Sequence, residues 1–154
     1  MEGEQVVKVD WHVVIGRTPD DVFGYITQVE RIPEWQRQGG VEKVTKLSDG
    51  PLGVGSRFRM ERRSRGRLAT IDAEVTAFEP GRRFDFHTVD NDGFVGDFAT
   101  TLGPRDPGTA LTWSVRMKTP NLLYRLLEPI IAREIRRSAE VDFAALKRTL
   151  EQVA

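Results

Sequence analysis

The chain has 154 residues, of which 23 are basic and 23 acidic, so its formal net charge is zero. A chain of this length can bury a core large enough to fold without staples, and we expect one domain over residues 1–154. The absence of cysteine excludes disulfides and thiolate metal sites. The balanced charge does not favour a nucleic acid or another polyanion as a partner.

The hydropathy pattern predicts no targeting or membrane segment. Residues 1–5 are polar and an alternating pattern follows them, so we predict no signal peptide. No apolar run approaches the roughly 20 residues that span a bilayer, which predicts no integral membrane segment. We therefore expect a cytoplasmic protein, and its oligomeric state stays open.

The first third of the chain predicts strands and short helices. Alternation of apolar and polar residues from Val7 to Ile15 predicts a strand with one buried face. The segment Thr18–Asp21 combines a capping hydroxyl, a proline at the first helical position and two acidic residues, which favours a helix start. Residues 31–35 predict a second short helix or turn. Weaker alternation over 41–47 predicts the second strand, and glycine and proline in 49–55 predict a loop.

Five further strands follow in the middle of the chain. We place them at 56–63, 68–78, 82–89, 93–102 and 109–118. The segments between them are too short for a parallel crossover, so the sheet must be an antiparallel meander. Each strand has one apolar and one polar face, which predicts a sheet with one dry side and one wet side.

The last third predicts a long amphipathic helix. Apolar residues recur at intervals of three and four from Asn121 to Val153. Because Pro129 cannot donate its amide, we expect a kink or a short leading helix over 121–128. A twisted sheet of this width tends to curl. The predicted fold class is therefore α+β: a helix grip, in which a curved antiparallel sheet of seven strands wraps the C-terminal helix, with two short helices between strands 1 and 2.

Several short motifs support this fold by their order and spacing. They are Thr18-Pro19-Asp20-Asp21-Val22-Phe23, Ile32-Pro33-Glu34-Trp35, Val54-Gly55-Ser56-Arg57-Phe58, Phe78-Glu79-Pro80-Gly81-Arg82 and Gly108-Thr109-Ala110-Leu111-Thr112-Trp113. Together with the terminal helix they resemble the START-like polyketide cyclase/dehydrase superfamily over nearly the whole chain. The resemblance implies a helix-grip fold with a deep hydrophobic cavity. It implies functions from lipid carriage and quinone binding to polyketide aromatisation, and the fold alone does not select among them.

The main functional hypothesis is a binding site for a hydrophobic small molecule, such as a lipid, a quinone or a polyketide. A curved sheet and a straight helix leave a gap, which we expect where small residues such as Ala73 and Gly96 face inward. Trp35 either caps the mouth of this cavity or anchors the short helix, and Trp113 forms a wall. The predicted ligand-binding residues are Trp35, Phe58, Met60, Ile71, Ala73, Phe84, Phe86, Phe98, Trp113, Leu123, Leu127 and Ile131.

The alternative hypothesis is a polyketide cyclase or aromatase that acts on a carrier-bound poly-keto chain. Arg62 follows Phe58 and Met60 on the inward face, where an unpaired guanidinium is costly, so it reaches the rim or holds a polar group. Tyr124 stands near the proline break, where we expect the cavity to open. Arg62 and Tyr124 are the leading catalytic candidates, with Tyr25 and Glu61 behind them. No catalytic constellation is visible, so enzymatic activity stays open.

Other features of the sequence have simpler interpretations. Six arginines between positions 57 and 67 could bind phosphates or an acidic carrier protein, but a solvated hairpin is the favoured interpretation. Residues 90–93 resemble the start of a calcium loop without its later ligands, and a hairpin turn explains them better. We predict no metal and no cofactor. His12 and His87 are expected on the surface, and the arginine hairpin lacks the interleaved aromatic residues of a nucleic-acid site.

Overall fold

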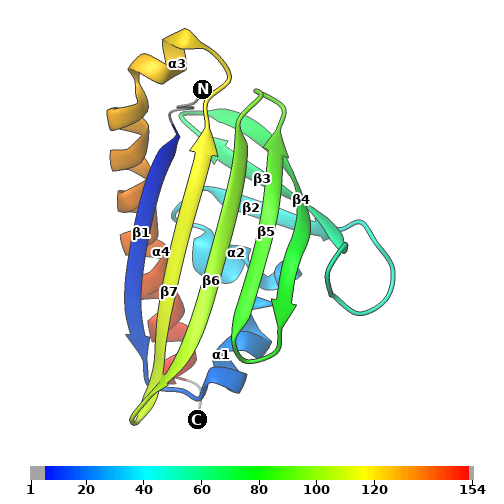
Figure 1. Cartoon of the computed structure of the whole chain (residues 1–154), viewed down its shortest axis with the longest axis vertical. Helices are drawn as coiled ribbons and strands as arrows, with labels where there is room; N and C mark the ends of the chain where they lie inside the picture. Colours follow the sequence, from blue (N-terminus) through cyan, green and yellow to red (C-terminus); the bar gives the residue numbers. More distant parts are fainter. Residues whose placement is uncertain (1–5, 153–154) are drawn as a thin grey trace.

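The computed structural model of the chain describes residues 6–152. Seven strands form one sheet, and the helices lie between the first two strands and at the end of the chain (Figure 1). In chain order the elements are β1 (Val7–Ile15), α1 (Pro19–Ile26), the 3-10 turn η1 (Val29–Arg31), α2 (Pro33–Gln36), β2 (Val41–Lys46), β3 (Arg57–Ser64), β4 (Arg67–Glu79), β5 (Arg83–Asp90), β6 (Val95–Arg105), β7 (Gly108–Lys118), α3 (Leu122–Leu126) and α4 (Glu128–Gln152).

The sheet is an antiparallel meander closed by the first strand. Its order is β1-β7-β6-β5-β4-β3-β2, so the last strand lies between the first strand and the sixth. The registers keep apolar residues side by side on one face, as where Val115 of β7 pairs with Val9 on one side and Phe98 on the other. Helix α4 runs behind β1 and β7, and the sheet curves around it (Figure 1). The predicted helix-grip fold class is confirmed.

The segment between β1 and β2 folds into three short pieces. Thr18 caps α1 by accepting a hydrogen bond from the backbone N–H of Asp21 (3.1 Å), and Pro19 occupies the first helical turn. The second short helix predicted around 31–35 is a 3-10 turn followed by the one-turn helix α2. These pieces cover the part of the sheet that α4 does not reach.

The C-terminal helical segment is interrupted just before α4, as predicted from Pro129. Helix α3 is capped by the Asn121 side chain, which accepts a hydrogen bond from the N–H of Tyr124 (3.0 Å), and α4 begins at Glu128. The expectation that one apolar stripe is buried along the whole segment is wrong. Leu123, Leu126 and Leu127 are exposed, because the break turns α3 across the end of the sheet (Figure 1). No helix within residues 6–152 is long and apolar enough to cross a membrane.

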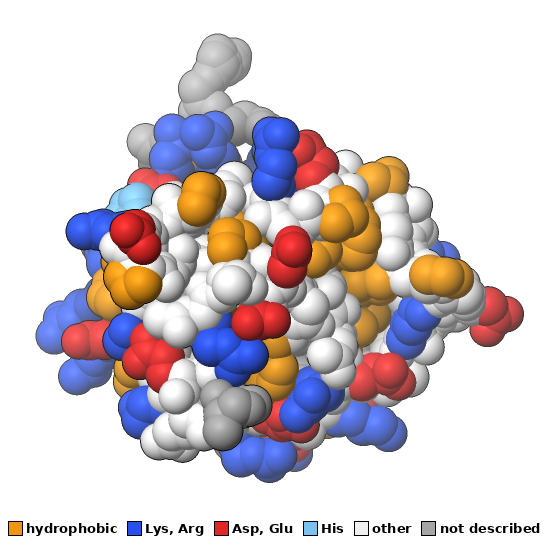
Figure 2. Space-filling view, turned by 90° about the horizontal axis from the view of Figure 1, so that it is seen from below, with side chains coloured by type: hydrophobic (Ala, Val, Ile, Leu, Met, Phe, Trp, Pro, Cys, Tyr) orange, Lys and Arg blue, Asp and Glu red, His pale blue; other side chains and the backbone are white. Residues whose placement is uncertain are grey.

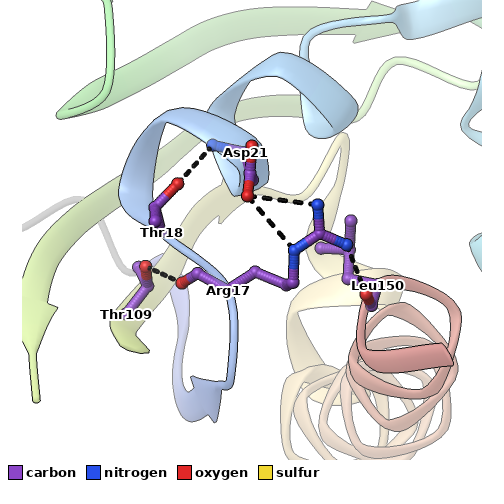
Figure 3. A network of polar contacts seen from close by, with 5 residues as sticks. All are labelled: Arg17, Thr18, Asp21, Thr109 and Leu150. Atoms are coloured by element: carbon purple, nitrogen blue, oxygen red, sulfur yellow. Dashed lines mark hydrogen bonds and ion pairs between the residues drawn. The ribbon is translucent and has the colours of Figure 1, made fainter. Parts of the chain in front are cut away.

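One end of the fold is closed by polar contacts between α4, β7 and the turn after β1 (Figure 3). The guanidinium of Arg17 donates to the carboxylate of Asp21 (3.1 Å) and to the carbonyl oxygen of Leu150 (2.8 Å). The backbone carbonyl of Arg17 accepts a hydrogen bond from the hydroxyl of Thr109 (2.6 Å), whose side chain is fully buried. The C-terminal end of α4 is thereby fixed against the sheet, and the interior at this end is filled by side chains such as Leu146.

Candidate ligand-binding site

A cavity of about 130 Å³ lies inside the grip. Strands β3 to β7 form its floor, and α2 and α4 form its roof. Most of its surface is apolar, and the polar groups gather where α2, β3 and α4 meet. The lining residues are Ile26, Ile32, Trp35, Gln36, Gly39, Val41, Met60, Arg62, Ile71, Phe84, Phe86, Phe98, Thr100, Leu111, Trp113, Val115, Met117, Ile135, Ser138, Ala139, Asp142 and Phe143.

Aromatic rings form the apolar wall and hold one another in place. Phe86 stacks on Phe98 across β5 and β6 with ring centroids 5.1 Å apart, and Phe98 continues to Trp113 at 6.0 Å. Phe143 of α4 contacts both Trp113 and Trp35, each at 5.5 Å. Because each ring packs against a neighbour, the wall is a preformed surface for an apolar guest.

The polar end of the cavity contains two buried polar atoms without a hydrogen-bond partner among the described residues. They are Oδ1 of Asp142, a residue 8% exposed, and Nε1 of Trp35, a residue 7% exposed. Beside them, Nε of Arg62 donates to the carbonyl oxygen of Gly39 (2.9 Å). An unpaired buried polar group costs stability. Groups of this kind that line a cavity are available to a guest.

The environment of Asp142 shifts its protonation equilibrium toward neutral pH. Burial raises the pKa of Asp142 from 3.8 to about 6, against the opposing effects of the positive Arg62 and a backbone hydrogen bond from Gly39. Gly39 is needed at this place, because a Cβ there would lie 2.5 Å from Oδ2 of Asp142. A carboxyl group with this pKa can both take up and release a proton near neutral pH.

An open groove of about 290 Å³ adjoins the polar end of the cavity, and the two share Gly39, Arg62 and Ser138. The groove is lined mainly by polar residues, among them Arg63, Arg65 and Arg137. Arg62 therefore stands between the inner apolar space and an outer basic surface.

The arginine hairpin has more acidic partners than the sequence suggested. Its arginines form ion pairs with carboxylates of β2, β4, α4 and the turn between β5 and β6. The pairs are Arg59–Asp72 (2.6 Å), Arg63–Glu42 (2.8 Å), Arg65–Glu134 and Arg67–Asp92. Because the side chains of these pairs are exposed or only partly buried, each pair contributes little to stability.

The structure brings together seven of the twelve predicted ligand-binding residues. Those that line the cavity are Trp35, Met60, Ile71, Phe84, Phe86, Phe98 and Trp113. Phe58 and Ala73 are buried in the core but do not line the cavity, and Gly96 does not line it either. The side chains of Thr88, Phe98 and Met117 occupy the space beside Gly96. The cavity is therefore not at the position that we predicted from the small strand residues. The role of the lining residues in binding stays a prediction.

The remaining predicted binding residues lie away from the cavity. Leu123 and Leu127 are exposed on and after α3. Ile131 packs with Val7, Val9 and other residues in a second small core beneath β1 and β7. The three were predicted from a continuous helical stripe, and the break before α4 removes that continuity.

Of the catalytic candidates, only Arg62 reaches the cavity. The ring of Tyr124 contacts Phe94 at 4.9 Å outside the cavity lining. The hydroxyl of Tyr25 donates to Glu34 (2.8 Å), and burial together with this bond raises the pKa of Tyr25 to about 12. Glu61, on the opposite face of β3 from Arg62, does not line the cavity.

Sequence reasoning missed Asp142, although a signal was present. Asp142 follows Ala139 by three positions and precedes Leu146 by four, which places it on the buried stripe of α4. A charged residue within an apolar stripe is expensive to bury, and such residues are concentrated at functional sites.

We predict that Asp142→Asn stabilises the protein in a pH-dependent manner. The pKa of Asp142 is about 6 in the folded protein and 3.8 without burial. Between these two pH values the carboxyl is protonated in the folded state and ionised in the unfolded state. The stability of the unchanged protein therefore falls as the pH rises through this window. At about pH 8 we expect Asp142→Asn to raise the free energy of unfolding by about 1–2 kcal/mol, since one pKa unit corresponds to about 1.4 kcal/mol and water in the cavity reduces the effect.

Urea unfolding of both proteins at about pH 8 and about pH 4 measures this difference, which should vanish at the lower pH. Asp49→Asn, a change in an exposed loop residue, is the matched control and should show no such trend. A lower stability of Asp142→Asn at about pH 8 would contradict the proposed cost of burial.

Comparison with known proteins places this architecture among characterised folds. Helix-grip structures match nearly the whole chain. One is the ZhuI aromatase/cyclase from Streptomyces sp. R1128, with a TM-score of 0.78 and 15% identity, covering 96% of this chain and 95% of that one. Another is a START superfamily protein from Mycobacterium smegmatis, with a TM-score of 0.78 and 16% identity, covering 96% and 99%.

The fold likeness also extends to a protein named Ara h 8.0201, at a TM-score of 0.72 and 13% identity, covering 95% of this chain and 98% of that one. At these identities the likeness shows a shared fold. No curated protein matches the chain significantly in sequence. A family model described as polyketide cyclase/dehydrase and lipid transport matches residues 6–151. With nearly every residue included in that match, the chain belongs to the polyketide cyclase/dehydrase and lipid transport family.

Proposed function

We propose that this protein binds a hydrophobic small molecule that carries one neutral polar group. The observation that supports the proposal is an aromatic cavity with unpartnered polar atoms of Asp142 and Trp35 at one end. The apolar part of the guest packs against Phe86, Phe98 and Trp113. Its polar group enters the end occupied by Asp142 and Arg62.

The volume of the cavity limits what is held inside it. At about 130 Å³ it is similar to an engineered cavity of about 150 Å³ that accepts benzene. A lipid, quinone or polyketide is larger, so such a ligand places one ring or a short chain inside and extends into the adjoining groove past Arg62 and Ser138. Met60 and Met117 are flexible lining residues and can adapt to ligands of different shape.

The polar end favours a hydroxyl or carbonyl oxygen over a charged group. Nε1 of Trp35 offers a hydrogen-bond donor, and Oδ1 of Asp142 offers an acceptor when the carboxyl is ionised. A carboxylate ligand would meet the negative Asp142 above pH 6 in a site of low dielectric constant. A hydroxyl both accepts and donates hydrogen bonds, so it matches a donor such as Nε1 of Trp35 and an acceptor such as Oδ1 of Asp142.

Binding of an apolar fluorescent probe tests this function. We predict that Ser138→Phe weakens the affinity for N-phenyl-1-naphthylamine about tenfold or more, because the added ring occupies space where the cavity and the groove meet. Ala144→Phe, on an exposed position of the same helix, is the matched control and should bind the probe as the unchanged protein does. Equal binding by all three proteins would show that the probe lies elsewhere, and absence of binding would remove the basis of the proposal.

A second candidate function is cyclisation of a poly-keto chain held by an acidic carrier protein. The observation that favours it is the pairing of Asp142, with its pKa of about 6, and the positive Arg62 at the end of an apolar cavity. Asp142 would accept a proton from the methylene carbon beside a carbonyl group, while N–H groups of Arg62 and Trp35 stabilise the enolate oxygen. The groove with Arg63, Arg65 and Arg137 offers the carrier a basic surface. A structural neighbour, ZhuI, is named as an aromatase/cyclase.

Ring formation from a carrier-bound poly-keto chain tests the second candidate. If the protein accelerates this reaction, Asp142→Asn should lower the rate by about a hundredfold, which is a typical contribution of a general base. Tyr124→Phe serves as the control, because Tyr124 lies outside the cavity lining, and it should keep the full rate. No acceleration over buffer would leave ligand binding as the function, and an accelerated rate that is unchanged in Asp142→Asn would contradict the role of Asp142 as the proton acceptor.

A further inference from the structure

Large hydrophobic side chains are exposed in one short segment of the chain. Five of the ten exposed large hydrophobic residues in the described part of the chain fall within nine consecutive positions. We call these five the apolar ridge: Leu122 (69% exposed), Leu123 (65%), Leu126 (72%), Leu127 (37%) and Ile130 (51%). Exposed hydrophobic residues are usually scattered singly, and a contiguous group marks an interaction surface.

The ridge is held in a defined position. Leu122 and Leu126 lie one turn apart on α3, Leu127 lies at the break, and Ile130 lies in the first turn of α4. The Asn121 side chain caps α3, the ring of Tyr124 packs against Phe94 in the turn between β5 and β6, and the hydroxyl of Thr119 donates to Glu128 (3.1 Å). Helix α3 therefore projects from one end of the molecule (Figure 1).

The opposite end of the molecule has a different surface. Seen from below, its hydrophobic side chains lie in small groups among charged side chains of both signs (Figure 2). The ridge differs from this surface because its leucines and isoleucine lie within nine consecutive residues.

The segment that carries the ridge is strongly basic. Residues 116–137 contain six basic and two acidic side chains, a net charge of +4, although the whole chain is neutral. Of the acidic pair, Glu134 is ion-paired with Arg65, and Glu128 is half-buried and accepts the bond from Thr119. Exposed leucines flanked by arginine and lysine are typical of helices that lie in the interface of an anionic membrane.

The charge and the composition of the ridge favour an anionic membrane over a second copy of the chain and over a protein partner. A second copy of the chain would oppose the same basic segment to itself across a two-fold axis, which like charges disfavour. A protein partner usually meets an interface rich in aromatic residues and methionine, whereas the ridge consists of leucine and isoleucine alone. Aliphatic side chains of this kind insert readily at the boundary of headgroups and acyl chains.

We propose that the apolar ridge docks the protein on an anionic lipid membrane. The leucines of α3 insert below the lipid headgroups, and exposed cations such as Arg133 and Arg136 lie near the lipid phosphates. The ridge lies outside the cavity lining, so this proposal goes beyond ligand binding and does not depend on it.

Flotation with vesicles of phosphatidylcholine, with or without phosphatidylglycerol, tests the proposal. We expect the protein to float with the anionic vesicles and to be released by salt. The double change Leu123→Glu and Leu126→Glu should lower vesicle affinity about tenfold or more, because it places two carboxylates where apolar side chains insert. Arg133→Glu should lower it about fivefold or more by reversing one charge. Val54→Glu, a change in an equally exposed residue of the loop between β2 and β3, should leave it unchanged.

Circular dichroism and binding of the apolar probe on the same variants separate loss of docking from loss of folding. Folded variants that bind the probe but no longer float support the proposal. It is overturned by absence of flotation, by equal flotation with phosphatidylcholine alone, or by equal losses in Val54→Glu and the double variant. Two further results would overturn it if vesicles are also not bound. One is a dimer formed through the ridge, seen by light scattering, and the other is capture of an acidic carrier protein by the ridge.

Discussion

Phe143 of α4 contacts Trp35 of α2 and Trp113 of β7, each at a ring distance of 5.5 Å, and the interior of the fold depends on this three-ring contact. On the C-terminal side of Phe143 the helix presents large side chains, and Leu146 and Leu150 fill the space against the sheet. On its N-terminal side the helix presents Ser138 and Ala139, which are too small to fill it. The three rings thus form part of the cavity wall, and the small side chains of Ser138 and Ala139 leave the space beside them open.

Burial of the Asp142 carboxyl lowers the stability of the fold, and contacts within the protein do not fully offset this loss. Packing an apolar or neutral side chain at this position would increase stability, and unpaired buried carboxyls are rare for that reason. Retention of such a group beside an apolar cavity is typical of sites that trade stability for function. The same group serves both functions considered above, as a hydrogen-bonding partner of a ligand or as a proton acceptor. The geometry of the site is thus better defined than the identity of its ligand.

Residue patterns predicted the fold in detail where burial and chain direction follow from local sequence. The alternation of Val7 to Ile15 placed the first strand, and Pro129 placed the break before the main helix. Alternation along β3 also predicted that Arg62 faces inward, and Arg62 does line the cavity. Six of the predicted lining residues followed from the same rule, because strand register fixes which side chains share a face.

The misplaced residues have a common physical cause. We expected the apolar stripe in the last third of the chain to form one buried surface. A helical period indicates that residues share one side of a helix, but it does not show that this side is buried. The break before α4 turned Leu123 and Leu127 outward and carried Tyr124 away from the cavity. Asp142 was assigned to no site. Its environment is created by Gly39 and Arg62, which are distant in sequence and meet it only in the folded chain.

The fold leaves an apolar, unfilled space between the curved sheet and the middle of α4. A crystal structure determined under xenon pressure measures this directly, because xenon enters dry apolar cavities without requiring a particular ligand. The account predicts xenon density beside Phe98 and Trp113, beneath Ala139. Side chains that occupy this space, or ordered water in place of xenon throughout it, would contradict the account.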